Sequence, residues 1–454
     1  MIQDTQTNRL GTQPVGKLLF QLALPAIAAQ LVNMLYNIVD RMYIGNMVSA
    51  DALTGVGVTF PIILIISAFS SLIGMGGAPH ASIKLGQQDH KGAEQILGNC
   101  FTSLLGFSVI LTIIFYMFGK PLLFLFGASE QTISYGIDYL NIYIAGTIFV
   151  QLSLGLNPFI STQGFATTSM LTVIIGAVTN IILDPIFIFV LNLGVKGAAI
   201  ATIISQGISC FWVLNFLLGK KTKLKIQKKY LKLKSSVLLP IIALGVSPFI
   251  MQSTESLLNI ALNSSLQKYG GDLSVASMTI LSSLMQLIMV PLSGLTQGAQ
   301  PIIGYNFGAK NVQRVQKTFR LLLISGMSFT ILLWSLMMIQ PQIFIRLFND
   351  DPQLIEHTVW ALRIYLAGVF IFGAQVCCQQ TFIAIGQAKI SLLLALLRKI
   401  ILLIPLIYLL PPFFSDKVFA VFLAEPIADI LATCVTILTF RFQFKKIISQ
   451  LEIV

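Results

Sequence analysis

The apolar stretch from Val15 to Ile44 sets the strongest limit on what this chain can fold into. A helix of about 20 apolar residues crosses the roughly 30 Å of hydrocarbon in a bilayer, and this stretch is long enough to do so. It contains Pro25, which removes one backbone hydrogen bond and favours a bend. Four polar residues follow at spacings of three or four and share one helical face: Gln30, Asn33, Asn37 and Asp40. Because a polar face that ends in a carboxylate needs protein or water beside it, we expect this helix to line a cavity.

Eleven further apolar stretches follow, and together they predict an all-α polytopic membrane protein. Hydrophobic residues make up 56% of the 454-residue chain and charged residues only 10%, a balance that is not typical of soluble globular proteins. No small-residue cleavage site follows the first stretch, so we expect it to be a membrane span rather than a signal peptide. The twelve predicted transmembrane helices cover approximately residues 16–44, 53–78, 94–118, 133–157, 168–191, 195–218, 237–265, 275–300, 315–340, 358–382, 390–411 and 416–440.

Basic residues are concentrated in alternate loops and indicate the orientation of the chain. Eight lysines lie between Lys220 and Lys234, in the loop after the sixth predicted span. Because cytoplasmic loops are enriched in Lys and Arg, we expect both termini in the cytoplasm and the chain in the inner, or cytoplasmic, membrane of the cell. A basic loop beside an anionic leaflet also accounts for much of the net charge of +12, so we expect lipid and no nucleic acid as its partner.

The basic loop divides the chain into two sets of six spans that resemble each other. A shift of 222 residues aligns the two halves in five separate regions, which predicts an internal repeat. The longest match sets Tyr143-Ile-Ala-Gly146 against Tyr365-Leu-Ala-Gly368. Because each half has an even number of spans, the halves are expected to be parallel and related by a pseudo-two-fold axis along the membrane normal. We therefore predict an N-terminal lobe (1–218), a basic cytoplasmic linker (219–236) and a C-terminal lobe (237–454), with a cavity between the lobes.

Polar residues of the first lobe fall at one depth in the membrane. At 1.5 Å per residue, five of them lie about 10 Å below the outer surface: Asp40, Tyr139, Asn180, Asp184 and Thr202. Asp40 could instead pair with Arg41, and Asp184 could cap a helix that Pro185 breaks. The shared depth favours a functional site, because ionisable groups inside a bilayer cost several kcal/mol unless they are paired or hydrated. Two carboxylates with an amide, a hydroxyl and a phenol can hold a proton or a hard cation through oxygen atoms.

The second lobe has a different set of charged residues. Glu255 lies near the middle of the seventh span with no evident partner, so it is our candidate for contacting a cationic substrate. Glu425 and Asp429 lie one turn apart in the last span. Arg398 and Lys399 in span eleven could neutralise both of them, which would make that group a structural ion pair.

Sequence motifs for other chemistry are absent. The chain has no GxxxxGK[ST] phosphate loop, and it has no HExxH, CxxC or GxSxG motif. We therefore expect no enzymatic activity and no cofactor other than a coupling ion.

The motifs of the first half resemble those of a known transporter family. LALPAIAAQLVNMLYNIVDRMYIG is followed by ALTGVGVTFPI, GGAPHASIKLGQQDHKGAEQILGN, LFGASEQTI and VTNIILDPIFI, a series similar to that of the multidrug and toxin extrusion (MATE) family. The resemblance covers nearly the whole chain. It implies export of amphipathic, often cationic drugs and toxins by alternating access between two six-helix lobes, driven by a cation gradient.

The resemblance also assigns roles to individual residues. It implies a coupling-ion site for H⁺, with Na⁺ as the second candidate, formed by Asp40, Tyr139, Asn180, Asp184 and Thr202, and a bend of the first helix at Pro25. The Na⁺ ligands among these residues would be Asp40, Asn180, Asp184 and Thr202. Glu255 matches an acid that a subset of the family carries in helix 7. Helix 10 reads VFIFGAQVCCQQ and lacks the acid of that subset, so we expect the coupling ion in the first lobe.

Two other transporter classes share parts of this pattern. A flippase for lipid-linked precursors would have the same fold, but its anionic substrate favours a cationic cavity, whereas the unpaired cavity charges predicted here are acidic. A major-facilitator transporter also has six plus six helices, but its loop between spans 2 and 3 would carry a Gly-, Asp- and Arg-rich signature, where this chain reads KLGQQDHKGAEQ. We expect small-molecule substrates, a lipid surround and a monomeric protein.

Overall fold

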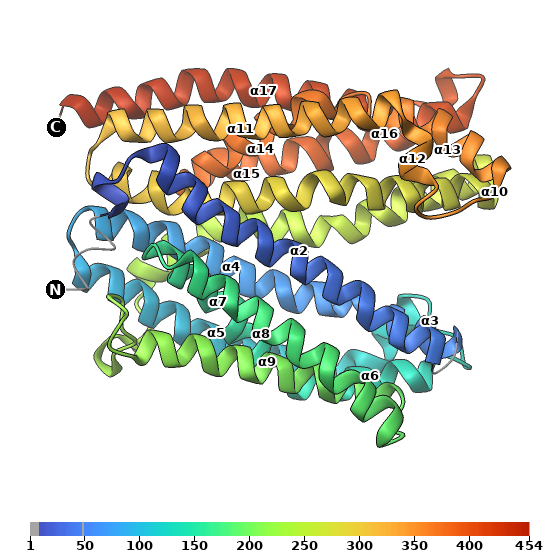
Figure 1. The fold of residues 1–454 in the computed structure, drawn as a ribbon, viewed down its shortest axis with the longest axis horizontal. Coiled ribbons are helices and arrows are strands. Elements are labelled where there is room, and N and C mark those ends of the chain that lie inside the picture. The colour runs from blue at the N-terminus through green and yellow to red at the C-terminus, as the bar shows by residue number, and fades with distance from the viewer. Residues whose placement is uncertain (1–8, 48–49, 454) are drawn as a thin grey trace.

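The computed structural model describes residues 9–47 and 50–453, and within these ranges the chain is almost entirely helical and has no β-strand. The helices run along one long axis (Figure 1). The start of the described chain, the end of the last helix and the basic linker lie at one end of the bundle, which we call the terminal end; the other is the opposite end. The predicted all-α class is confirmed.

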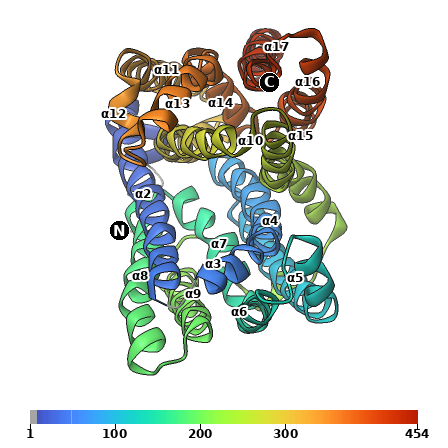
Figure 2. The same cartoon turned by 90° about the vertical axis from the view of Figure 1, so that its right-hand side faces the viewer.

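The first half of the chain contributes eight α-helices and one π-helical turn. They are α2 (Val15–Met47), α3 (Ala50–Gly57), α4 (Phe60–Gly86), α5 (His90–Leu125), α6 (Ile133–Ala145), α7 (Thr147–Thr162), α8 (Ala166–Pro185), the π-helical turn Ile186–Val190, and α9 (Val195–Leu218). The second half contains α10 (Ser235–Gly308), α11 (Val312–Ile339), α12 (Pro341–Ile345), α13 (Pro352–Tyr365), α14 (Val369–Ala384), α15 (Ala388–Leu396), the π-helical turn Leu397–Leu403, α16 (Ile404–Leu409) and α17 (Lys417–Ile453). Two short 3-10 turns, Lys228–Tyr230 and Pro411–Phe413, complete it. Figure 2 shows the first half, in blue to green, gathered below the second half, in yellow to red.

The helices of the described chain are long and apolar enough for multiple membrane crossings. Nine helical stretches are long and apolar enough to cross a membrane. Two bent helix pairs, each counted as one span, bring the number to eleven. One of the nine, α10, has 74 residues and would be about 110 Å long as a single helix, far more than a bilayer needs. It is two helices joined at Gly271, where φ is 64°, a left-handed value that favours glycine. Counting α10 as two helices brings the described stretches to twelve, and the exact number of membrane crossings stays a prediction.

Two predicted spans differ from straight helices. The span predicted at 133–157 is the pair α6 and α7, bent by 59°, and the span predicted at 358–382 is the pair α13 and α14, bent by 50°. The bends fall at Gly146 and just before Val369, where the Tyr-x-Ala-Gly matches end. The longest sequence match between the halves therefore marks a shared bend, because the two motifs end at the same structural position.

A reciprocal contact joins the two halves at the terminal end. A Cβ atom added to Gly86 of α4 would lie 2.0 Å from the carbonyl oxygen of Tyr305 in α10, and one added to Gly308 would lie 2.0 Å from the carbonyl oxygen of Ile83. The 222-residue shift carries Ile83 onto Tyr305 and Gly86 onto Gly308. A contact whose two sides exchange under the repeat is the contact that the predicted pseudo-two-fold axis requires.

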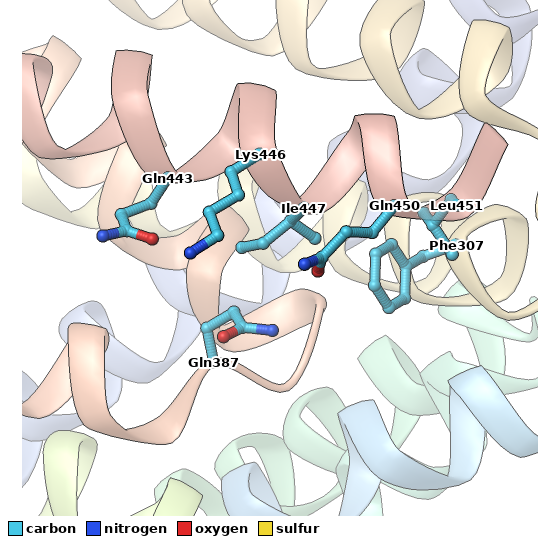
Figure 3. A pocket seen from close by; sticks show the side chains of 7 residues that line it. All are labelled: Phe307, Gln387, Gln443, Lys446, Ile447, Gln450 and Leu451. Atoms are coloured by element: carbon cyan, nitrogen blue, oxygen red, sulfur yellow. The ribbon is translucent and has the colours of Figure 1, made fainter. Parts of the chain in front are cut away.

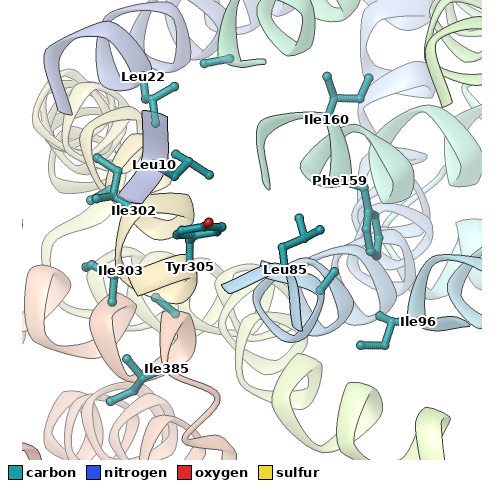
Figure 4. Packing of buried hydrophobic residues seen from close by; sticks show 14 of the residues in the cluster. Leu10, Leu22, Leu85, Ile96, Phe159, Ile160, Ile302, Ile303, Tyr305 and Ile385 are labelled. Carbon is teal, nitrogen blue, oxygen red and sulfur yellow. The ribbon is translucent and has the colours of Figure 1, made fainter. Parts of the chain in front are cut away.

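The apolar cores show where the halves meet and where they separate. The largest cluster combines both halves at the terminal end, as Figure 4 illustrates with Leu10 and Leu85 beside Ile303 and Tyr305. At the opposite end, one cluster contains only residues of the second half, from Leu258 onward, and another only residues of the first half, up to Ala199. Within the described residues, the halves are thus packed together at the terminal end and have separate cores at the opposite end.

The basic linker packs on the first half rather than extending into solvent. Gln163 Oε1 accepts hydrogen bonds from Thr222 Oγ1 (2.9 Å) and from the backbone N–H groups of Lys223 (2.7 Å) and Leu224 (3.1 Å). Asn99 Oδ1 accepts one from the N–H of Lys234 (2.8 Å). From the sequence we expected a basic loop beside the anionic leaflet, and the structure adds that buried amides of the bundle hold the backbone of this loop.

Candidate functional site

Asp184 lies where α8 changes from α-helical to π-helical geometry. Pro185 has no N–H, so the carbonyl of Ile181 loses its helical donor, and the chain continues as the π-helical turn Ile186–Val190. Such turns are frequent at functional sites because they displace side chains from the regular helical register. The Asp184 side chain is fully buried.

Three predicted site residues meet around the Asn180 amide. Asn180 Nδ2 donates to Asp184 Oδ1 on the same helix and to Thr202 Oγ1 on α9, both at 3.3 Å. Thr202 Oγ1 in turn donates to the carbonyl of Ala198 (3.0 Å). All three side chains are buried, with at most 4% of their surface exposed. The structure therefore brings together the residues that sequence placed at one depth on α8 and α9.

Asp40 and two tyrosines complete the cluster. The carboxyl group of Asp40 on α2 interacts directly with that of Asp184. The side chains of Tyr139 on α6 and Tyr36 on α2 lie near Thr202 and Asp40 and interact electrostatically with them. Tyr36 was missing from our predicted site, although it lies one turn before Asp40 and therefore on the same helical face.

Two oxygen atoms of this cluster are left without a donor. Asn180 Oδ1 and Asp184 Oδ2 are buried and accept no hydrogen bond from the described residues. A buried acceptor without a donor is unfavourable by about 1–3 kcal/mol, and two nearby carboxylates repel when both are ionised. A proton or a hard cation supplies what both features require. The described residues contain no group of three or more His, Cys, Asp and Glu side chains that could hold a metal ion, so a cation here would depend on amide and hydroxyl oxygens as well.

The remaining residues predicted on the first helix lie along α2. Gln30 Nε2 donates to Gln297 Oε1 of α10 (3.3 Å), which links the two halves. Asn33 is exposed, and α2 continues as a helix through Pro25. The side chains of Asn37 and Arg41 lie outside the described part of the structure, so the alternative pairing of Asp40 with Arg41 stays a prediction.

In the second half, the prediction that Glu255 lacks a partner is wrong. Lys399 Nζ donates to Glu255 Oε2, and also to the carbonyl of Met251 (2.9 Å). Sequence could not place this pair because its members are 144 residues apart and Lys399 lies on the π-helical turn Leu397–Leu403.

The predicted ion pair of the last span is confirmed for only one of its two bases. Arg398 donates to Asp429 Oδ1 (2.6 Å) and to Glu425 Oε1 (2.7 Å), whereas Lys399 turns to Glu255 instead. The Arg398 guanidinium also lies over the Phe372 ring, 4.4 Å from its centroid. These contacts make Arg398 the centre of a buried structural network.

A surface pocket lies elsewhere, at the terminal end. Figure 3 shows polar side chains of α17 around it, facing the loop between α14 and α15. It is lined by Phe307, Gln387, Gln443, Lys446, Ile447, Gln450 and Leu451. None of these residues belongs to the Asp184 cluster or to the Glu255 network.

Comparison with known proteins agrees with this architecture. A sequence model of the MatE family matches residues 25–186 and 248–409. The chain belongs to the MATE family. The two matched segments are equal in length and start and end at nearly the 222-residue spacing predicted from the sequence, so each half of the chain corresponds to one copy of the MATE family pattern.

Individual MATE-related proteins match over almost the full chain. The multidrug export protein MepA of Staphylococcus haemolyticus (strain JCSC1435) is 26% identical over 433 residues, which cover 95% of each chain. The crystal structure of a MATE protein in the bent conformation has a TM-score of 0.93 at 22% identity, and a multidrug resistance MATE family transporter in an outward-facing conformation has a TM-score of 0.91 at 23% identity. Each of these two similarities covers 99% of both chains, and together they establish the multi-pass membrane fold.

Proposed function

We propose that this MATE-family protein exports amphipathic, often cationic small molecules by alternating access, as an antiporter driven by protons or by Na⁺. Membership of the MATE family and the name of the MepA relative, a multidrug export protein, support the substrate class.

The single observation that supports ion coupling most strongly is the adjacency of Asp40 and Asp184. Two carboxylates in contact favour sharing a proton or a cation, because both cannot be ionised without strong repulsion. Asp40 lies on α2 and Asp184 on α8, so the state of the pair changes how α2 packs against α8. One charge that falls through 100 mV supplies about 2.3 kcal/mol, enough to shift a two-state equilibrium by more than tenfold.

The packing of the two halves supports the direction of opening. The shared apolar core closes the terminal end, and the cores at the opposite end are separate. Since basic residues are concentrated at the terminal end, we assign that end to the cytoplasm. In this orientation the shared core lies on the cytoplasmic side and the separate cores lie on the outer side. Pro25 is the point at which a bend of α2 would move Asp40 relative to Asp184.

Transport in proteoliposomes tests the proposal. Purified protein is reconstituted, an inward or outward gradient of H⁺ or of Na⁺ is imposed, and ethidium movement is followed by fluorescence. We expect gradient-driven accumulation with the wild type and none with Asp184→Asn. Asp138→Asn is the matched control, because this carboxylate is an exposed partner of Lys196 (3.5 Å) outside the cluster.

Two results would contradict the proposal. Ethidium movement that ignores both gradients would exclude coupled antiport. Wild-type activity in Asp184→Asn would exclude the first-half cluster as the coupling site. Movement of a lipid-linked sugar without any movement of ethidium would support the flippase alternative instead.

A further inference from the structure

The second half contains a charge network with a defined imbalance. Three carboxylates, those of Glu255, Glu425 and Asp429, face two cations, those of Arg398 and Lys399. Arg398 binds both Glu425 and Asp429, so Lys399 is the cation that serves Glu255. When all five groups are ionised, the network has one net negative charge.

The two parts of the network differ in accessibility. The side chains around Arg398 are sealed, since Arg398 is 11% exposed, Glu425 3% and Asp429 0%. Lys399 is similarly enclosed at 10%, but Glu255 is 52% exposed. A molecule from outside the protein can therefore reach the Glu255 carboxylate but not the acids that Arg398 binds.

The exposed side of Glu255 faces the other half of the protein. Gln252 Oε1, three residues earlier in α10, accepts a hydrogen bond from Ser71 Oγ of α4 (3.0 Å), and the Phe249 and Phe69 rings meet with their centroids 5.1 Å apart. Residues three apart share a helical face, so Glu255 lies on the face that meets α4, one turn closer to the opposite end. From that point onward the two halves have separate apolar cores.

The Lys399 ammonium group occupies the position that a bound cation would take at Glu255. Its ammonium group has two oxygen partners, Glu255 Oε2 and the Met251 carbonyl, which lie one turn apart on α10. The π-helical turn Leu397–Leu403 changes the angle between consecutive side chains. This geometry allows Arg398 and its neighbour Lys399 to bind acids on two different helices, α17 and α10.

We infer that Lys399 is a tethered cation that fills a cation-binding position at Glu255, and that an organic cation entering between the halves must displace it. The substrate class in this inference rests on the proposed function. Because Lys399 stays attached to the chain, a bound monovalent cation brings the net charge of the network from −1 to zero. Lys399 is therefore a specificity-determining residue of the second half, and it is not part of the first-half site.

The exchange selects cations that also have an apolar body. A tethered ammonium group has a high effective concentration at its partner, so a small hydrated cation such as Na⁺ competes poorly with it. An amphipathic cation adds burial of its apolar surface, at about 25 cal/mol per Å², and so compensates for the displacement. Lys399 thus favours amphipathic organic cations over inorganic ones at Glu255.

Equilibrium binding to the purified protein tests this inference without any ion gradient. Tetraphenylphosphonium, an amphipathic monovalent cation, and triphenylphosphine oxide, an uncharged analogue, are used as probes in equilibrium dialysis. Lys399→Met keeps an unbranched side chain, one heavy atom shorter, and removes its charge, so tetraphenylphosphonium should bind roughly tenfold more tightly, a typical coupling between partly screened charges. Lys399→Arg should keep the wild-type affinity, and the uncharged probe should bind all variants equally.

A double variant and a charge exchange complete the design. In Glu255→Gln/Lys399→Met the gain should disappear, because the carboxylate that attracts the probe is gone. If Lys399→Met does not fold, the exchange Glu255→Lys/Lys399→Glu keeps the ion pair but places the cation on the exposed side, and tetraphenylphosphonium should then bind several-fold more weakly than in the wild type. An unchanged affinity in Lys399→Met or in the exchanged pair, or an equal gain for the uncharged probe, overturns the inference. The binding assay uses no ion gradient, so its outcome is independent of whether the proposed gradient-driven transport is observed.

Discussion

Substitution of Gly245 by alanine should shift the protein away from the conformation described here. Gly245 of α10 packs against α4, and a Cβ atom at this position would lie 1.8 Å from the carbonyl oxygen of Leu72 and 3.0 Å from its Cα atom. Non-bonded atoms meet at roughly 3.5 Å, and backbone atoms of a helix cannot rotate aside as a side chain can. The two helices must therefore separate at the terminal end, where the shared core holds the halves together.

The expected size of the effect follows from that clash. Overpacking by one methyl group typically costs about 1–3 kcal/mol, and only the conformation with α4 and α10 in contact bears this cost. An equilibrium between two conformations changes by about 5- to 150-fold for that free energy. Gly245→Ala should thus populate a state that is open at the terminal end and closed at the opposite end.

Distances between spin labels on the two halves measure this shift. Cysteines replace Lys196 of α9 and Lys417 of α17, two exposed positions at the opposite end, in a background without the native cysteines. Double electron–electron resonance should give a shorter label distance in Gly245→Ala. Gly106→Ala is the matched control, since a Cβ atom at Gly106 has nothing within 4 Å. The reasoning is refuted if Gly245→Ala keeps the wild-type distances, or if Gly106→Ala changes them equally.

Three further predictions concern the first half. Asp40→Asn should abolish gradient-driven ethidium export at normal expression and thermal stability, because it removes one member of the carboxylate pair; drug resistance at the wild-type level would exclude this role. Pro25→Ala should retain substrate binding but lose its dependence on pH between 6 and 8, as measured by affinity in detergent, and an unchanged dependence would exclude the bend. The N–H of Gly92 (2.8 Å) and the Lys84 ammonium (3.0 Å) hold the pKa of Asp89 below its usual range. Stability from Asp89 is therefore present above the unfolded-state pKa and is lost as pH falls through the folded-state pKa, so Asp89→Asn should flatten the acid limb of a melting-temperature profile, and an identical limb in both proteins would contradict this.

The fold was largely predictable because membrane helices are set by local composition. A backbone in hydrocarbon must satisfy its own hydrogen bonds, so a long apolar stretch has few conformations other than a helix. The repeat was predictable for a related reason. Gly164 and Gly386 match under the 222-residue shift and both adopt positive φ, at 88° and 75°, a requirement that a sequence records directly as glycine.

The partners of the charged residues were less predictable than the helices. Asp184, Asn180 and Thr202 were found together because helical spacing converts position into depth, and depth is a local property. Tyr36 had the same signal, being one turn from Asp40, but a tyrosine is common in apolar helices and its spacing was not used. The Lys399–Glu255 pair had no local signal, because neighbouring residues on a π-helical turn point in directions that a regular α-helix would not give.

The two halves share their contacts but not their charges, and this difference bears on where ion coupling resides. Gly86 and Gly308 make reciprocal contacts, so the repeat preserves the contact surface between the halves. In the second half, Arg398 and Lys399 supply permanent cations to the acids around them. In the first half, no ion pair of the described residues includes Asp184, and its Oδ2 atom accepts no hydrogen bond from them. A carboxylate whose counter-charge is a fixed side chain does not need a transported ion. Asp184 has no ion pair among the described residues, so we expect H⁺ or Na⁺ to bind in the first half, where its binding would change the packing of α2 against α8.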